Sequence, residues 1–183
     1  KQMMQHFYCE VGLLHEEVLG VDSINVKQQF NYEKKQDLFD EINDTILSTL
    51  FDGIKKGVFS SAKFDSLPEL YFARLCETDK EILKWLRPAP KEFNIKYNNG
   101  KQYEPDFVVE TNNVIYLVEV KGEDRLSDPD VLAKKNRSVS YCKVATNWCL
   151  ANGYKPWIHL FIPAKQIQTN VTFKQLAQQF SVK

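Results

Sequence analysis

The sequence predicts an α/β fold in which a small mixed sheet is flanked by helices. Two observations predict it. Four segments have the apolar alternation or the continuous apolar run of β-strands, and apolar residues at helical spacing lie before, between and after them. The expected order over residues 61–183 is an αβββαβ core followed by a last helix, which places helices against the faces of one sheet. Residues 1–60 are expected to form a separate N-terminal helical extension.

The extension contains two stretches with apolar side chains at helical spacing, over residues 3–19 and about 34–57. These apolar residues are Met4, Phe7, Val11, Leu14 and Val18 in the first stretch, and Leu38, Ile42, Ile46, Leu50 and Ile54 in the second. Neither stretch contains a chemical motif, so both are expected to be packing helices.

Two capping sequences follow the extension. Ser66-Leu67-Pro68-Glu69 has the form of a capping box with a proline near the helix start, and apolar residues follow it at Leu70, Phe72, Ala73 and Cys76. Thr78-Asp79-Lys80-Glu81 resembles a second cap. It predicts a short helix that ends before Pro88, since the residue before a proline avoids the helical region.

The strand segments carry three separate signals. Phe93, Ile95 and Tyr97 alternate with polar residues, and Asn99-Gly100 predicts a hairpin turn because both residues tolerate positive φ. Tyr103–Glu110 is the expected returning strand. Val114–Lys121 is almost continuously apolar at its start, as expected of a central strand covered on both faces.

The C-terminal third predicts a helix, a strand and a helix. Asp128-Pro129 begins a helix that runs to about Leu150 and stops at Asn152-Gly153. Trp157–Ile162 is a buried strand ended by Pro163, and the last short helix is marked by Phe173, Leu176, Ala177 and Phe180. We expect Val144, Trp148 and Cys149 in the core, and His159 as a core histidine with satisfied hydrogen bonds.

Composition excludes several classes of protein. The chain has 183 residues, of which 43% are hydrophobic and 26% charged, as in ordinary globular domains. No run approaches the ~18 apolar residues of a membrane span. The cysteines form no CxxC pair, which argues against a zinc ribbon and favours free thiols in a cytoplasmic protein. They are Cys9, Cys76, Cys142 and Cys149.

Charge is distributed unevenly along the chain. The net charge is zero, but residues 131–183 contain eight basic and no acidic side chains, whereas residues 1–130 contain 16 basic and 24 acidic ones. A charge of +8 on one segment indicates either a surface that faces a polyanion or scattered solubilising lysines. The basic residues of the helix after Asp128 are Lys134, Lys135, Arg137 and Lys143.

Two carboxylates and one amine carry the predicted chemistry. Successive side chains of a strand point to opposite faces, so Glu119 and Lys121 share the face of Ile115 and Leu117. If the two strands are antiparallel neighbours, Asp106 reaches the same edge. Clustered carboxylates repel each other, and a divalent cation removes that cost. Mg²⁺ accepts two carboxylates and a backbone carbonyl while it keeps several waters.

The carbonyl of Val120 is the expected third protein ligand. Lys121 would then orient and help to deprotonate an attacking water, or stabilise the charge of the transition state. Hydrolysis of a phosphodiester is the reaction that this set of groups predicts. The alternative is that Glu119 and Lys121 form a plain surface pair and that Asp106 caps a turn after Pro105.

Pro105-Asp106 followed by Glu119-Val120-Lys121 resembles the PD-(D/E)XK nuclease superfamily, which has the restriction-endonuclease-like fold. The sequence at residues 64–69, 103–107 and 117–122 is similar to the C-terminal endonuclease domain of the type III restriction enzyme Res subunit and of related helicase–nuclease fusions. The resemblance covers about residues 60–165. It implies that Asp106 and Glu119 bind Mg²⁺, or Mn²⁺ as a substitute, and that Lys121 assists the attacking water.

The resemblance also implies a fourth acid and several partners. Glu69 stands where a glutamate of the first core helix completes the site, although it could instead close the capping box. The helix after the motif packs beside the site in this superfamily, which makes Lys134, Lys135 and Tyr141 candidates for DNA contact. The implied partners are double-stranded DNA, an ATP-dependent helicase or translocase upstream in the same chain, and a modification methyltransferase subunit.

Nothing in these 183 residues has the spacing of an ATP-binding phosphate loop, so the chain is not the motor itself. Since the sequence opens without Met, we expect a piece of a longer polypeptide. Three functions remain open from sequence. They are a Mg²⁺-dependent DNA endonuclease, a DNA-binding module that keeps the fold without cleaving, and a domain that holds partner subunits together.

Overall fold

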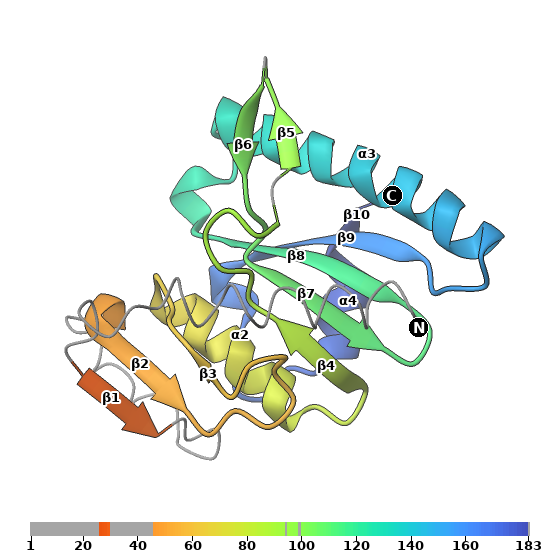
Figure 1. The fold of residues 1–183 in the computed structure, drawn as a ribbon. Helices are drawn as coiled ribbons and strands as arrows, with labels where there is room; N and C mark the ends of the chain where they lie inside the picture. Colours follow the sequence, from red (N-terminus) through yellow and green to blue (C-terminus); the bar gives the residue numbers. More distant parts are fainter. Residues whose placement is uncertain (1–25, 30–45, 94, 99, 183) are drawn as a thin grey trace.

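The main sheet lies at the centre of the molecule and contains five strands (Figure 1). They are β4 (Ile82–Leu86), β7 (Phe107–Thr111), β8 (Ile115–Lys121), β9 (Trp157–Pro163) and β10 (Ser181–Val182). Their order is β10-β9-β8-β7-β4; β8 and β9 are parallel and all other neighbours are antiparallel. The fold is therefore mixed α/β. The computed structural model describes residues 26–29, 46–93, 95–98 and 100–182.

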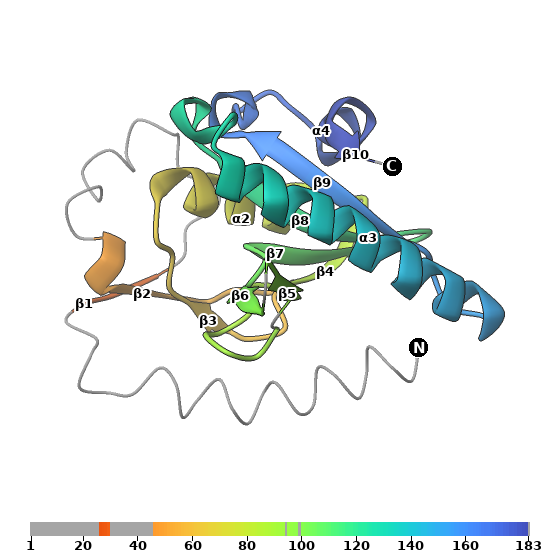
Figure 2. The same cartoon turned by 90° about the horizontal axis from the view of Figure 1, so that it is seen from above.

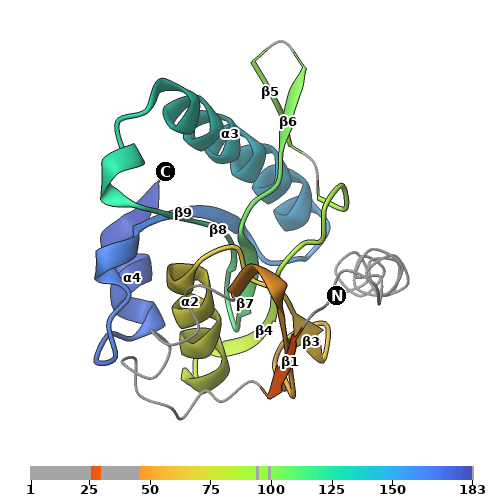
Figure 3. The same ribbon diagram turned by 90° about the vertical axis from the view of Figure 1, so that its left-hand side faces the viewer.

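Helices cover both faces of this sheet (Figures 1 and 3). Helix α3 (Pro129–Ala151) lies along one face, where it buries Cys142 and Cys149 against Ile115 and Leu117. Helices α2 (Leu67–Thr78) and α4 (Phe173–Phe180) cover the other face. Figure 2 shows α3 running alongside β9. The strands between these layers are apolar on both sides because each face has its own core.

Two smaller sheets accompany the main one. A three-stranded sheet contains β1 (Val26–Gln29), β2 (Thr49–Asp52) and β3 (Ser61–Ala62) in that order. A hairpin of β5 (Ile95–Tyr97) and β6 (Lys101–Tyr103) projects beyond the main sheet beside α3 (Figure 1). Arg137 of α3 donates its Nε–H to the Lys96 carbonyl at 2.8 Å and so ties the hairpin to the helix.

Most of the expected elements after residue 93 are confirmed, but the first expected strand, β5, pairs with β6 in a separate hairpin and is not part of the main sheet. The hairpin turns at Asn98 and Gly100, which have φ of 31° and 92°. Asp128 caps α3 by accepting the N–H groups of Asp130 and Val131, and the chain leaves the helix at Asn152. Strands β8 and β9 and helix α4 also lie where the sequence predicts them.

The returning strand predicted over residues 103–110 is split. Strand β6 ends at Tyr103, and β7 begins only at Phe107. Pro105 lies in the break and has no N–H to donate to a ladder. Asp106 therefore precedes the ladder of β7, and its carboxylate is available for contacts with the end of β8.

The short helix predicted from Asp79 to before Pro88 is wrong, because this segment is strand β4. Ile82 and Trp85 are buried in the same core, and their spacing of three residues is also the spacing expected on one face of a helix. The register between β4 and β7 shifts between Ile82 and Lys84. This bulge brings the side chains of Ile82 and Trp85 to the same face of the sheet. The Asp79 carboxylate instead accepts the N–H of Phe173 at 2.7 Å, at the start of α4.

The helix predicted over residues 34–57 is wrong in its second half. Residues 46–48 form a 3-10 turn, and Thr49–Asp52 form β2, in which Thr49, Leu50 and Phe51 are all buried. Gly53 then has a positive φ of 85°. The first half of that helix and the helix expected over residues 3–19 lie outside the described residues. The domain boundary expected between residues 60 and 61 stays a prediction.

Three finer expectations also need correction. Helix α2 begins after Ser66, but the Ser66 side chain makes no cap bond, so the predicted capping box does not form. Val144 and Trp148 are 69% and 48% exposed, because α3 turns these positions away from the sheet; only Cys149 is buried as expected. The cysteines at positions 76, 142 and 149 are free and buried, and Cys9 lies outside the described residues.

Candidate active site

The candidate site lies where β7 begins and β8 ends. Phe107 pairs with Val118 in the antiparallel ladder, which places Asp106 across from Glu119. Ile115 and Leu117 belong to the core beneath α3, whereas Val118 and Val120 belong to the core beneath α2 and α4. The alternation predicted for this strand is thus confirmed, and it leaves Glu119 and Lys121 at the end of the face that α3 covers.

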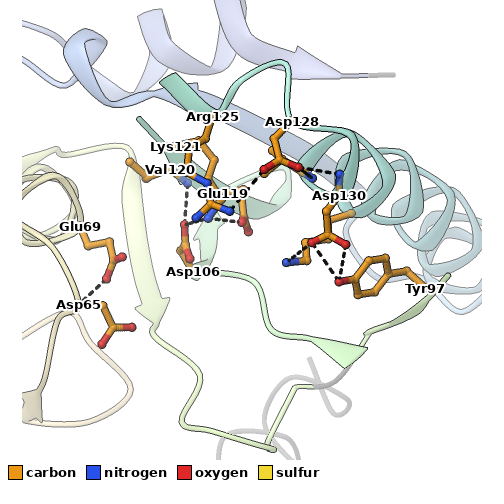
Figure 4. Close-up of polar contacts among 12 residues, drawn as sticks. Asp65, Glu69, Tyr97, Asp106, Glu119, Val120, Lys121, Arg125, Asp128 and Asp130 are labelled. Atoms are coloured by element: carbon orange, nitrogen blue, oxygen red, sulfur yellow. Dashed lines mark hydrogen bonds and ion pairs between the residues drawn. The ribbon is translucent and has the colours of Figure 1, made fainter. Parts of the chain in front are cut away.

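Asp106, Glu119 and Lys121 meet at this point (Figure 4). Lys121 Nζ lies 2.6 Å from Glu119 Oε1 and 3.9 Å from Asp106 Oδ2. The Val120 N–H donates to Asp106 Oδ2 at 2.8 Å. Three groups that are distant along the chain therefore share one cluster, as the sequence predicted. We call Asp106, Glu119 and Lys121 the Lys121 cluster.

The Lys121 cluster is largely buried, and its one base does not balance its two acids. The side chains of Asp106 and Glu119 are 16% and 8% exposed, and Lys121 is 22% exposed. Burial, followed by the charge of Glu119, raises the pKa of Asp106 to about 7. Burial also raises the pKa of Glu119, although Lys121 opposes the change. Burial disfavours the charged form of Lys121, but the two acids outweigh it and raise the Lys121 pKa.

One oxygen of the cluster has no partner. Glu119 Oε2 is buried and accepts no hydrogen bond from any described residue. A buried carboxylate oxygen that accepts no hydrogen bond destabilises the folded state, so a cation or a water bound at this atom would be stabilising.

The residues present fit a hard divalent cation. Asp106 and Glu119 supply two carboxylates, and the Val120 carbonyl is directed to the same side of β8 as its N–H, which meets Asp106. The Val120 side chain is buried in the core, as expected. Within the described residues, no group of three or more His, Cys, Asp or Glu side chains gathers as a metal site. A cation here would thus depend on the carbonyl and on water, as Mg²⁺ does.

Glu69 does not join the Lys121 cluster. Its Oε2 lies 2.7 Å from Arg87 Nη1 and accepts the N–H of Asp65 at 3.0 Å. Arg87 Nη2 lies 2.7 Å from Asp65 Oδ2. We call Asp65, Glu69 and Arg87 the Arg87 cluster; Figure 4 shows Asp65 and Glu69 apart from the Lys121 cluster. Burial, opposed by Arg87 and reinforced by Asp106, raises the pKa of Glu69, so the two clusters influence each other electrostatically.

The three candidates on α3 occupy different surroundings. Lys134 pairs with Asp130 at 2.9 Å, lies 5.4 Å from the centroid of the Tyr97 ring, and lowers the pKa of Glu119. Lys135 lies over the Phe161 ring at 4.9 Å. Tyr141 packs edge-on against Phe93 and Trp157. Of these three residues, Lys134 is therefore the one whose charge acts on Glu119, whereas the Tyr141 ring packs against neighbouring rings.

Sequence reasoning missed two residues near the site. The Arg87 guanidinium lies over the rings of Phe64 and Phe107, at 5.6 and 5.8 Å from their centroids. A charged residue within the otherwise apolar segment Trp85-Leu86-Arg87-Pro88 is the sequence signal that could have indicated it. The Tyr103 hydroxyl is buried without a hydrogen-bond partner among the described residues. Burial is the main cause that raises the Tyr103 pKa, and the negative charge of Glu119 is the second. The Tyr103 hydroxyl is therefore close enough to interact electrostatically with the Lys121 cluster.

His159 is buried as expected, but only one of its nitrogens has a partner. Nδ1 lies 3.0 Å from the Leu117 carbonyl, whereas Nε2 has none among the described residues. Burial lowers the His159 pKa to about 4, so the ring is neutral at physiological pH. His6 and His15 lie outside the described residues.

No match to this chain was found among models of protein families, curated proteins or solved structures. None of the described helices is long and apolar enough to cross a bilayer.

Proposed function

We propose that this chain is a Mg²⁺-dependent DNA endonuclease domain that hydrolyses phosphodiester bonds. The observation that supports it most is the Lys121 cluster, in which two buried carboxylates and one amine meet at the ends of neighbouring strands. Without the β5-β6 hairpin, the element order α2-β4-β7-β8-α3-β9 matches the αβββαβ order of the restriction-endonuclease-like fold, which adds support, although β4 takes the place of the strand expected at residues 93–97. The motif resembles the nuclease domain of type III restriction enzymes.

Each group of the cluster would have a distinct role. Asp106, Glu119 and the Val120 carbonyl would hold the cation. Mg²⁺, when bound, supplies positive charge against the phosphate and a polarised water. Lys121 donates to Glu119 Oε1, and its remaining N–H groups can orient the attacking water or a phosphate oxygen. Attack would form a bond between the water oxygen and phosphorus and break one phosphorus–oxygen ester bond, and the leaving sugar oxygen would take up a proton as the water loses one.

The partners and the cellular site belong to the same proposal. Double-stranded DNA would be the substrate, an ATP-dependent helicase or translocase would precede this domain in its parent chain, and a methyltransferase subunit would complete a cytoplasmic complex. Lys134 and Lys135 would face the DNA backbone from α3, where phosphate contacts supply salt-dependent affinity.

The test is Mg²⁺-dependent cleavage of DNA by the chain within its parent complex. Alanine at Asp106, Glu119 or Lys121 should each abolish cleavage while the complex still assembles. Asp124→Asn, a change of an exposed acid close to β8, is the matched control and should cleave like the wild type. Absence of cleavage by the intact complex, or full activity of the three alanine variants, would reject the proposal.

A DNA-binding module that does not cleave is the second candidate. It is favoured by the engagement of Glu69 with Arg87, which leaves the cluster with two carboxylates. This module would bind DNA in a salt-dependent manner and would bind no Mn²⁺ at Asp106 and Glu119. Metal titration of the wild type and of Asp106→Asn therefore separates the two candidates.

A further inference from the structure

A cavity of about 320 Å³ opens directly beside the Lys121 cluster, and Asp106 lies on its wall. The wall is formed by β3 with the loops before and after it, by the end of β4 with the segment that follows it, and by the segment before β7. Its volume is at the lower end of the range for small-ligand sites, which is large enough for one nucleotide unit rather than for a peptide or a duplex.

One part of the wall is apolar and suits a flat ring. It includes Phe59, Ala62, Pro88, Ala89 and Pro90. A nucleobase has two apolar faces, and contact between a base and an aromatic or apolar wall provides affinity with little dependence on the base.

The other part of the wall is charged and contains two cations, Lys63 and Arg87, together with the carboxylates of Asp65, Glu104 and Asp106. Lys63 forms no ion pair with a described residue. Arg87 is held on two sides, by Glu69, whose side chain is 11% exposed, and by Asp65, whose side chain is 77% exposed. Solvent weakens an exposed pair, so the Asp65 carboxylate is the partner that a phosphate can replace. The planar guanidinium of arginine matches a phosphate well.

We propose that this cavity holds one unpaired nucleotide of the substrate strand, with its base against the apolar wall and its phosphate on Arg87 in place of Asp65. The inference rests on the proposed endonuclease activity and adds a substrate class to it. Because the cavity adjoins Asp106, the scissile bond would lie next to an unpaired nucleotide, as in a single-stranded tail, a bulge or a flipped base.

Binding to the metal-free chain tests the cavity without any need for cleavage. We would titrate deoxyadenosine monophosphate, deoxyadenosine and inorganic phosphate by calorimetry. The monophosphate should bind more tightly than either fragment. Ser61→Phe, which fills the cavity, should weaken its binding by at least about tenfold. Ser60→Phe changes the exposed neighbour that is not part of the wall and should have no effect.

Two charge changes keep the test decisive if Ser61→Phe fails to fold. Asp65→Asn should tighten binding of the monophosphate by about threefold, and leave deoxyadenosine unchanged, because it removes the competitor for Arg87. Lys63→Ala should weaken binding by about threefold, whereas Lys84→Ala, at an exposed site of β4 outside the cavity, should not. Failure of the monophosphate to bind, or equal behaviour of the paired variants, would overturn the assignment.

Cleavage then distinguishes this inference from the proposed function. With Mg²⁺, the parent complex should cut a duplex with one bulged nucleotide at least about tenfold faster than a fully paired duplex. Equal rates on the two duplexes would overturn the substrate class while the endonuclease proposal stands. Monophosphate binding as expected, with no cleavage of any DNA, would reject the endonuclease and keep the nucleotide site.

Discussion

The Lys121 cluster and the Arg87 cluster each contain two acids and one base, yet they differ in how well the charges are satisfied. Arg87 reaches both of its acids at 2.7 Å, whereas Lys121 reaches Glu119 at 2.6 Å and Asp106 only at 3.9 Å. Asp65 is also largely exposed, while Glu119 is buried and Asp106 is only 16% exposed. A planar guanidinium with five donors can pair two carboxylates at once, and an ammonium beside two buried acids does so less completely.

This difference separates a structural ion pair from a site that needs a ligand. The Arg87 cluster is stable as it stands, and only its exposed acid is exchangeable. The Lys121 cluster has one base for two acids, raised pKa values at both acids, and a Glu119 oxygen that has no hydrogen-bond partner in the described part of the chain. Composition alone would not distinguish the two clusters, but cleavage, stability and pH dependence should.

The largest expected effect is on DNA cleavage. Glu119→Gln should reduce the rate by at least about 1000-fold, because it removes a carboxylate from the cation and from the reacting phosphate. Glu69→Gln makes the same chemical change in the Arg87 cluster and should reduce the rate by less than about tenfold. Single-turnover cleavage at saturating Mg²⁺ measures both. Equal losses would mean that Glu69 belongs to the reacting site after all.

The next effect is on stability and concerns the Arg87 cluster. Arg87→Met leaves Glu69 buried without its cation and should lower the free energy of unfolding by about 3–5 kcal/mol. Arg125→Met is the matched control, since Arg125 forms an exposed pair with Asp128 at 3.6 Å and should cost at most about 1 kcal/mol. Urea unfolding followed by circular dichroism measures both variants. A small cost for Arg87→Met would show that the pair contributes little to folding.

The third effect is the pH dependence of the Lys121 cluster without metal. The Asp106 pKa is about 7 in the folded protein against an ordinary value of 3.8, so the folded state keeps a proton that the unfolded chain releases. The free energy of unfolding should therefore fall as the pH rises from about 4 to about 7, by up to about 4 kcal/mol. The contribution of Asp106 is greatest below this window and is lost above it.

Asp106→Asn should make that fall smaller, and Asp124→Asn should retain it in full. The pKa values of Glu119 and Glu69 are also raised, so these two acids contribute a fall of the same sign that remains in Asp106→Asn. Urea unfolding between pH 4 and 8 in the presence of a chelator gives the slopes. His159 contributes the opposite trend between its ordinary pKa of 6.5 and about 4, so the comparison must be made between variants. An unchanged slope in Asp106→Asn would contradict the burial argument for this site.

Prediction from sequence succeeded where the signal was local. The alternation along Val114–Lys121 gave the faces of Glu119 and Lys121 correctly, and the break at Pro105 explains why Asp106 can reach the end of β8. It failed at β4, where a bulge imitates helical spacing, and at Val144 and Trp148, whose exposure depends on how α3 is turned against the sheet. It also missed Arg87, because nothing near Arg87 in the chain shows that Glu69 and Asp65 fold against it.

Local sequence is enough to predict the strand and helix periods after residue 93, the turn at Gly100, the start of α3 and the presence of two acids and an amine at strand ends. These features depend on neighbouring residues and on backbone preferences that act over a few positions. Long-range packing, in contrast, pairs Glu69 with Arg87, leaves one Glu119 oxygen without a hydrogen-bond partner among the described residues, and forms the cavity beside Asp106. The reason is that burial and charge compensation depend on groups brought together from distant parts of the chain.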